Sequence, residues 1–380
     1  MAEPTNNPSN PWRSAGGHPQ RRSLCVWLTA LIIFGAVQFA LSAGAPLALV
    51  HQHRVPYDIV KDDLRNVDLA MATVKNYIQR HAIKEFVIIL GDSVGYSGPG
   101  GPEQAVSRYL ADLAAAAGGP AVFNFSLPGA QIGDIYVLML KLQQHGLNPD
   151  WLIINLLYAG FVARVPDPPP VFWLRDELAR LDPAADLVTA PAYPAEERTE
   201  TAAERVEAAI IEWGQRYIPT LAYRDYLRAA LLGPAMTYAQ AEGSMPTPWY
   251  EKPWLDSYLR QAEYLRSYDP APLVMDDSNP NVFFLYRIAA RVAPHTRVLF
   301  FNSPVNPALL VDLQRTDGYQ ANLRAIDNLM LYLDQSYAGV DYVNYIRSID
   351  DRLFVDHLHL TPEGYAQLAA MLWAEIETAR

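Results

Sequence analysis

Short, unbroken apolar runs constrain the fold of this chain more than any other feature. Phe86–Leu90, Ala121–Phe125 and Trp151–Leu157 are apolar at nearly every position rather than at alternate positions. Strands of this kind are typical of a parallel sheet that helices cover on both faces. Helical segments at 103–117 and 132–145 separate the runs, so the sequence predicts a doubly wound α/β domain.

The same alternation resumes near the C-terminus, with predicted strands at Arg297–Asn302 and Val340–Tyr345 and a last helix at 362–378. Residues 163–280 interrupt it with prolines, helical patterns and a cluster of aromatic residues at 249–258. We interpret this segment as a mostly helical insertion rather than an independent domain. Core packing is the first interpretation of its aromatic residues, and contact with substrate is the alternative.

The N-terminus predicts a membrane anchor. Leu24–Ala43 contains no charged residue, and about 20 apolar residues are needed to cross a bilayer core. Arg21 and Arg22 precede the run, which favours a cytoplasmic N-terminus and an exported remainder. We therefore expect a disordered tail at 1–22, a transmembrane helix at 23–50 and the α/β domain at 51–380. A signal peptide cleaved near Ala43-Gly44-Ala45 is the alternative.

The composition of the chain argues against several classes of partner and site. The formal net charge is −11 and no stretch is rich in Lys or Arg, which argues against a nucleic-acid partner. Cys25 is the single cysteine, so an intrachain disulfide and a cysteine-based zinc site are both excluded. We expect no metal and no cofactor.

Three residues in separate segments could form a nucleophilic site. Ser93 follows the strand at 86–90 in the sequence Gly91-Asp92-Ser93, and Asp356 and His359 precede the last helix. A serine hydroxyl needs a base and a group that orients that base. In doubly wound sheets such sites form at the carboxyl ends of the strands, where both segments should lie. A metal site formed by Asp356, His357 and His359 is a weaker alternative, because no further ligand is evident.

These segments together resemble the SGNH (GDSL-type) hydrolase superfamily. The resemblance covers residues 85–160 and 295–380, through Gly91-Asp92-Ser93, Asn124–Gly129 and the Asp356-x-x-His359 motif. It implies a three-layer α/β/α, flavodoxin-like fold, with Ser93 as nucleophile, His359 as base and Asp356 as its partner. It also implies that the backbone N–H groups of Ser93 and Gly129 bind the oxyanion.

One position departs from the family pattern. The family places an Asn that donates to the oxyanion after its third strand, and Ala159 occupies that position here. Loss of one oxyanion donor typically costs about 100- to 1000-fold in rate. Asn155 lies four residues too early and is interpreted as structural, while Tyr158, Asn302 and Asn306 are unranked candidates for the missing donor.

The resemblance extends to membrane-anchored members that act beside membrane-bound O-acyltransferases. It implies a serine O-acyltransferase or esterase that moves or removes acetyl-type groups on cell-envelope or exopolysaccharides. The expected location is the bacterial inner membrane, with the catalytic domain in the periplasm. The expected partners are an acylated glycan or small acyl ester, the membrane and a membrane-bound O-acyltransferase. A lipid or thioester hydrolase and a catalytically silent SGNH-fold subunit are the alternatives.

Overall fold

The computed structural model describes residues 19–162, 168–193, 210, 213–214, 217–232, 247–259 and 268–380. Five strands form one sheet in the order β2-β1-β3-β4-β5. They are β1 (Phe86–Leu90), β2 (Ala121–Asn124), β3 (Trp151–Leu156), β4 (Arg297–Asn302) and β5 (Val340–Asn344). All four neighbouring pairs run parallel. The predicted parallel α/β sheet is therefore confirmed, in the flavodoxin-like order.

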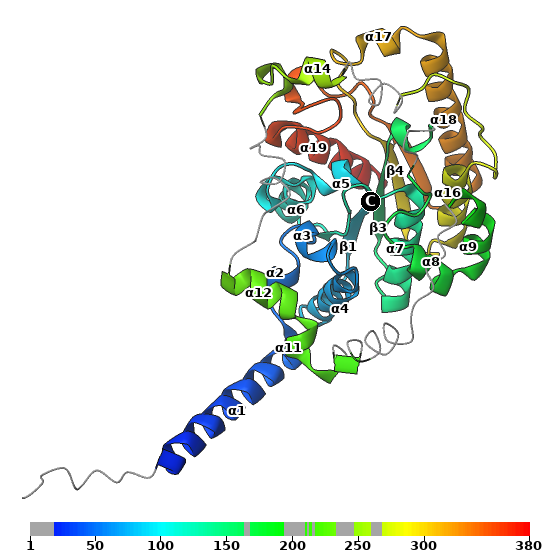
Figure 1. The fold of residues 1–380 in the computed structure, drawn as a ribbon. Coiled ribbons are helices and arrows are strands. Elements are labelled where there is room, and N and C mark those ends of the chain that lie inside the picture. Colours follow the sequence, from blue (N-terminus) through cyan, green and yellow to red (C-terminus); the bar gives the residue numbers. More distant parts are fainter. Residues whose placement is uncertain are drawn as a thin grey trace, which may run out of the picture.

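Helices cover both faces of the sheet. On one face α6 (Val106–Ala116) packs against α19 (Pro362–Ala379), and on the other α7 (Ile132–His145) packs against α16 (Pro280–Arg291). Figure 1 shows these two groups on either side of the strands, with α18 (Asp317–Ser336) beside α16. The covered sheet explains why β1 and β3 are buried at every position.

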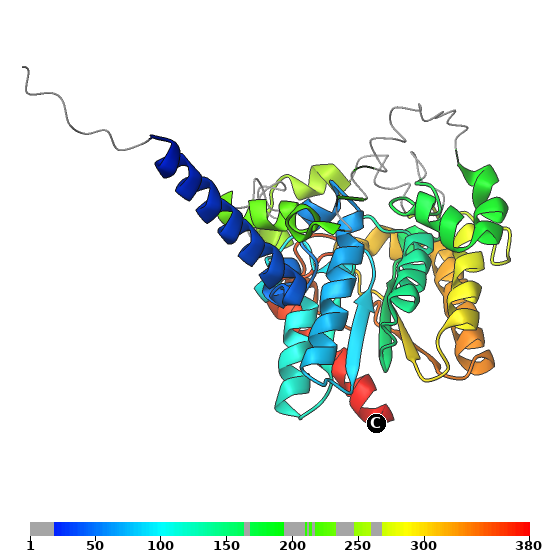
Figure 2. The ribbon, with the colours of Figure 1, turned by 90° about the horizontal axis from the view of Figure 1, so that it is seen from below.

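The remaining helices surround this core. They are α1 (Pro19–Gly44), α2 (Leu47–Val50), α3 (Tyr57–Val60), α4 (Arg65–Arg80), α5 (Ser93–Tyr96), α8 (Arg175–Leu181), α9 (Pro183–Thr189), α11 (Pro219–Ala222), α12 (Arg224–Leu232), α14 (Leu255–Leu259) and α17 (Val311–Gln314). The described parts of the 163–280 segment are mostly helical and lie beyond the carboxyl ends of the strands (Figure 2). Parts of this segment, and residues 1–18 of the expected disordered tail, lie outside the described residues.

The apolar spacing of residues 57–81 predicts one helix, and the structure contains two. The chain leaves α3 at Lys61 and starts α4 at Arg65. The Asp63 carboxylate accepts the backbone N–H of Arg65 at 3.1 Å. Such a local bond from a side chain to the backbone favours a new helix start, and hydrophobic spacing does not reveal it.

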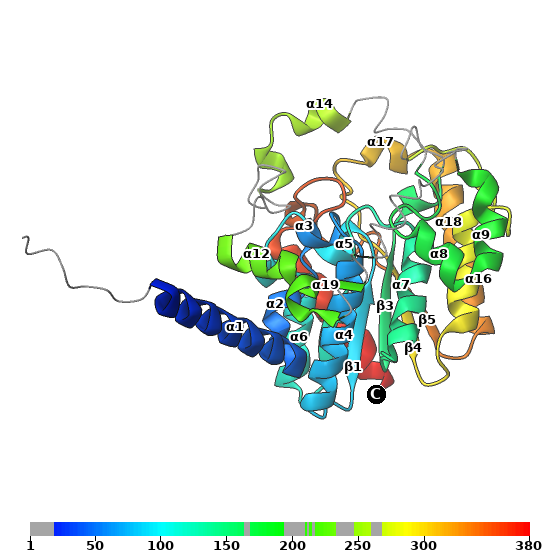
Figure 3. The ribbon, with the colours of Figure 1, turned by 60° about the horizontal axis from the view of Figure 1, so that its bottom comes forward.

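The N-terminal helix α1 projects from the rest of the molecule (Figure 3). Only its C-terminal part packs on the body, where Gln38 accepts the backbone N–H of Thr220 in α11. Among the helices of the described chain, none combines the length and the apolar character that crossing a membrane requires. The expected transmembrane anchor at 23–50 is thus not supported by the structure.

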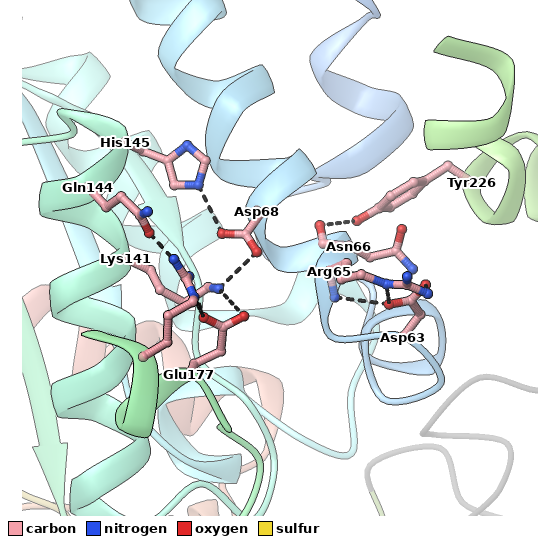
Figure 4. Close-up of polar contacts among 10 residues, drawn as sticks. Asp63, Arg65, Asn66, Asp68, Lys141, Gln144, His145, Glu177 and Tyr226 are labelled. Carbon is pink, nitrogen blue, oxygen red and sulfur yellow. Dashed lines mark hydrogen bonds and ion pairs between the residues drawn. The ribbon is translucent and has the colours of Figure 1, made fainter. Parts of the chain in front are cut away.

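A buried ion-pair cluster fixes the first helix of the 163–280 segment to the core. Lys141 of α7 is fully buried and contacts the carboxylates of Asp68 in α4 at 2.8 Å and Glu177 in α8 at 3.3 Å (Figure 4). Burial alone would raise the pKa of Asp68, but His145 and Lys141 outweigh it and lower that pKa. Since three helices share these contacts, α8 is held firmly beside the sheet.

Candidate active site

The nucleophile candidate lies at the first turn of a short helix. Strand β1 ends at Leu90, and Asp92 starts α5 by accepting the backbone N–H of Val94 at 2.8 Å. Ser93 is therefore the first helical residue, at the carboxyl edge of the sheet. Capping by an Asp side chain stabilises such a helix start and fixes the direction of the Ser93 side chain.

The base candidate reaches Ser93 from the far end of the chain. His359 Nε2 lies 2.9 Å from Ser93 Oγ, and His359 Nδ1 lies 2.8 Å from Asp356 Oδ2. Asp356 Oδ1 also accepts the backbone N–H groups of Leu358 and His359, each at 2.8 Å. The structure thus brings the three predicted residues together in the order serine, imidazole, carboxylate, which is the geometry of a nucleophile with an oriented general base.

The electrostatics of this loop favour an ionised Asp356. Burial alone would raise the pKa of Asp356, but the His359 ring outweighs it and holds that pKa far below its ordinary value. Burial also lowers the pKa of His357 to about 4, so this ring is neutral near pH 7. A permanently charged Asp356 stabilises the imidazolium that forms when His359 accepts a proton.

The two predicted oxyanion donors line one cavity of about 220 Å³, together with Ala159. Gly129 has φ +78°, which a residue with a side chain adopts only under strain. Asn124 links its loop to the nucleophile helix, because Asn124 Nδ2 donates to the Gly95 carbonyl at 2.8 Å. Across the described residues, the N–H groups of Ser93 and Gly129 donate to no protein acceptor. Both therefore remain available to a ligand.

None of the proposed replacements for the third donor points to this cavity with a free N–H or O–H group. Tyr158 donates its hydroxyl to the Asp269 carbonyl at 3.0 Å, and Asn306 Nδ2 donates to the Asp356 carbonyl at 3.3 Å. Neither residue lines the cavity, and nor does Asn302. Asn155 does line it, but both of its N–H groups already have acceptors.

The 163–280 segment contributes to the cavity wall. Tyr258 and Tyr268 line the cavity, as do Ile132 and Ile135 from α7. Trp249 has a different role, because its indole N–H donates to the Asp351 carbonyl at 2.8 Å and its backbone N–H to that of Phe354. Some aromatic residues of the 249–258 cluster therefore pack on the loop that leads to Asp356, and Tyr258 faces the cavity.

Two residues support the site in ways that sequence reasoning did not find: Arg54 was not named at all, and Asn306 was named only as a candidate for the missing donor. The Arg54 guanidinium is buried and donates to the carbonyls of Tyr96, Ser97 and Gly100, directly behind α5. Asn306 supports the His359 loop, because its backbone N–H donates to the His357 carbonyl at 2.9 Å. Bonds to backbone carbonyls leave no motif in a sequence, so neither supporting role carried a signal. In the described parts of the chain, no group of three or more His, Cys, Asp or Glu residues could hold a metal ion.

No known family model matches the sequence, and no curated protein sequence matches it. Two solved structures are similar in shape. Est24, a carbohydrate acetylesterase from Sinorhizobium meliloti, has a TM-score of 0.35 and 13% identity over 78% of this chain and 100% of its own. A family two carbohydrate esterase from Clostridium thermocellum, in complex with cellohexaose, has a TM-score of 0.31 and 10% identity over 78% of this chain and 65% of its own. Both likenesses are distant, so the function is inferred from the geometry of the site.

Proposed function

We propose that this protein transfers or hydrolyses acyl esters through a covalent intermediate on Ser93. The observation that carries the proposal is the pair of hydrogen bonds that joins Asp356 to His359 and His359 to Ser93 Oγ, at 2.8 and 2.9 Å. Ser93 and Gly129 both line the cavity, and the backbone N–H group of neither residue donates to an acceptor within the described chain, which supports their proposed role as oxyanion donors. This combination supplies a nucleophile, a base and oxyanion donors.

The proposed reaction has two steps. Ser93 Oγ attacks the acyl carbonyl while His359 Nε2 takes its proton, and the N–H groups of Ser93 and Gly129 stabilise the oxyanion. His359 then protonates the departing alcohol, which leaves the acyl group on Ser93. Water or a sugar hydroxyl then attacks this ester while His359 takes its proton. His359 gives that proton to Ser93 Oγ as the bond between Ser93 and the acyl group breaks, which releases the product and restores the free serine.

We propose an acetyl-type group on a cell-envelope polysaccharide or exopolysaccharide as the physiological acyl group. The resemblance to the SGNH superfamily supports this choice, and the cavity has room for a short acyl group together with part of its leaving group. A lipid or thioester hydrolase is a second candidate, favoured by Ile132, Ile135 and Leu157 in the cavity wall.

Labelling with a fluorophosphonate tests the serine chemistry. We expect the wild-type protein to be labelled covalently and Ser93→Ala to remain unlabelled, while Ser348→Ala, a control on the sequence after β5, is labelled normally. If the wild type is not labelled, the proposal fails and a catalytically silent subunit is favoured. If Ser93→Ala is labelled equally well, the reactive group is not Ser93 and the proposal fails as well.

Turnover separates the two substrate candidates. We expect release of acetate from acetylated xylan, and faster cleavage of p-nitrophenyl acetate than of p-nitrophenyl octanoate. Preference for the longer ester or for an acyl thioester, with no release from xylan, would instead favour the lipid or thioester hydrolase.

We also propose that α1 holds the protein at the bacterial inner membrane, with the catalytic domain in the periplasm and a membrane-bound O-acyltransferase as partner. Exposed apolar side chains along α1 support this, among them Trp27, Ile32 and Phe39, which are 69%, 71% and 75% exposed. Such a surface is unfavourable in water. Membrane fractionation tests it: the wild type should sediment with membranes, and Ile32→Lys should shift toward the soluble fraction. Equal distribution of the two proteins would contradict the proposal.

A further inference from the structure

Asn155 is a polar residue within an apolar strand. It lies in β3, whose six residues are all buried, and only 2% of Asn155 is exposed. A buried amide without hydrogen-bond partners destabilises a fold, so its contacts show why such a group is tolerated here. On one side of β3, the residues before Asn155 pair with β1. On the other side, Asn155 itself pairs with β4. Asn155 therefore lies next to the end of β1, where the turn that carries Ser93 begins.

The Asn155 amide holds Asp92 at two points. Asn155 Oδ1 accepts the Asp92 backbone N–H at 3.0 Å, and Asn155 Nδ2 donates to Asp92 Oδ1 at 2.8 Å. The second Nδ2 hydrogen is directed to Ser303 Oγ, at 3.3 Å, at the end of β4. Because every donor of the amide has an acceptor, its orientation is fixed.

Asp92, which Asn155 holds in place, in turn restrains Ser93. The same Asp92 Oδ1 that accepts from Asn155 also accepts the Val94 N–H, and so determines where α5 starts. Ser93 lies between Asp92 and Val94 in the chain. Asn155 holds Asp92, the residue before Ser93. The directions of the Ser93 Oγ and of the Ser93 backbone N–H therefore depend on Asn155.

The glycines of this turn are adapted to the same amide. A Cβ atom on Gly91 would lie 1.7 Å from Asn155 Oδ1, and a Cβ atom on Gly95 would lie 2.6 Å from it. Both distances are far inside van der Waals contact. Gly91 is therefore required because Asn155 leaves no space for a side chain there. Its backbone conformation is not the reason, because its φ is not positive.

We infer that Asn155 is a positioning residue for the Ser93 nucleophile, acting through Asp92 on both the serine hydroxyl and the first oxyanion donor. This role rests on the proposed serine chemistry and adds to it a residue that lies four positions before Ala159. Because Ala159 stands at the position of the family's third donor, the proposed oxyanion site depends closely on the direction of the Ser93 N–H. A small displacement of reacting groups can cost about 100-fold in rate.

The rate constant of fluorophosphonate labelling per folded molecule tests this inference. We expect Asn155→Ala to label about 10- to 100-fold more slowly than wild type. The KM for p-nitrophenyl acetate should change less than twofold, so the loss falls on kcat. The matched control is Asn66→Ala, which removes another buried amide, on α4 and far from Ser93, with hydrogen bonds to the Ile59 carbonyl and Asp225. It should label as fast as wild type.

A second variant keeps the test valid if Asn155→Ala does not fold. Asn155→Asp has nearly the same shape but places two carboxylates side by side, and such a pair ionises fully only with difficulty. We expect slow labelling at about pH 8 and a rising ratio of the Asn155→Asp rate to the wild-type rate as the pH falls toward about 5.5. A purely structural role would not produce this pH dependence.

The outcomes are distinguishable. Wild-type labelling that Ser93→Ala abolishes, combined with normal labelling of Asn155→Ala, would overturn this inference and leave the proposed function intact. Equal losses in Asn155→Ala and Asn66→Ala would also overturn it, since general destabilisation would then explain both. Absence of wild-type labelling would remove the proposed function first.

Discussion

Asp356→Asn tests the proposed triad through the orientation of one amide. In the wild type, Asp356 Oδ1 accepts two backbone N–H groups, from Leu358 and His359. In the variant only the amide oxygen can take that place, so the amide NH₂ must face His359 Nδ1. That nitrogen then accepts a hydrogen bond, and the ring proton moves to Nε2, where it points at Ser93 Oγ.

A His359 that carries its proton on Nε2 cannot take the proton of Ser93. Where an Asn substitution forces this tautomer on a serine nucleophile site, kcat falls about 10⁴-fold. The expected loss corresponds to about 5 kcal/mol of transition-state stabilisation. Both backbone bonds are retained, so the variant should still fold, although it loses the stabilisation that His359 gives to the ionised Asp356 carboxylate.

The assay is the rate of p-nitrophenyl acetate hydrolysis, with fluorophosphonate labelling as a second readout. Asp350→Asn is the matched control, because Asp350 lies six positions earlier, is exposed and caps a short turn through the Arg352 N–H at 2.9 Å. It should keep wild-type activity. If Asp356→Asn retains more than about a tenth of the wild-type rate, the tautomer argument is refuted.

Three further predictions concern the surroundings of the site. Burial lowers the pKa of His51 to about 4 from 6.5, so unfolding, which takes up a proton, removes about 3 kcal/mol of stability as the pH falls from 6.5 to 4. Urea unfolding of His51→Gln should show a weaker loss over this range, and an unchanged slope would contradict the assignment. Arg54→Met should lower the free energy of unfolding by about 3 kcal/mol and slow labelling of Ser93, because three carbonyls behind α5 lose their donor. Lys141→Met should destabilise by about 2 kcal/mol, measured by urea unfolding, without slowing labelling; slower labelling would show that the cluster in Figure 4 reaches the site.

The sequence predicted the strands well because their signal is local. Each unbroken apolar run became a parallel strand, with ends within a residue of the expected ones. The helix expected at 57–81 is interrupted between α3 and α4, where the Asp63 carboxylate accepts the Arg65 backbone N–H. The transmembrane helix at 23–50 found no support, and the domain boundaries and catalytic roles stay predictions.

The residues of the candidate site that belong to short sequence motifs could be predicted. Ser93 follows a strand, and Asp356 and His359 lie three residues apart, so chain order alone suggested their meeting. Asn155 was interpreted as structural, because its partners Asp92 and Ser303 lie just after two other strands, β1 and β4, and the sequence around Asn155 does not reveal them. Contacts of that kind depend on how the strands are ordered, which local patterns do not specify.

The candidate site brings together residues that are far apart in the sequence. Arg54 supports the turn behind Ser93, while His359 lies 266 residues beyond Ser93. Synthesis proceeds from the N-terminus, so a nascent chain can form the serine turn long before its base exists. Under the mechanism proposed above, Ser93 therefore lacks its base until the loop of Asp356 and His359, which leads into α19, folds against the sheet.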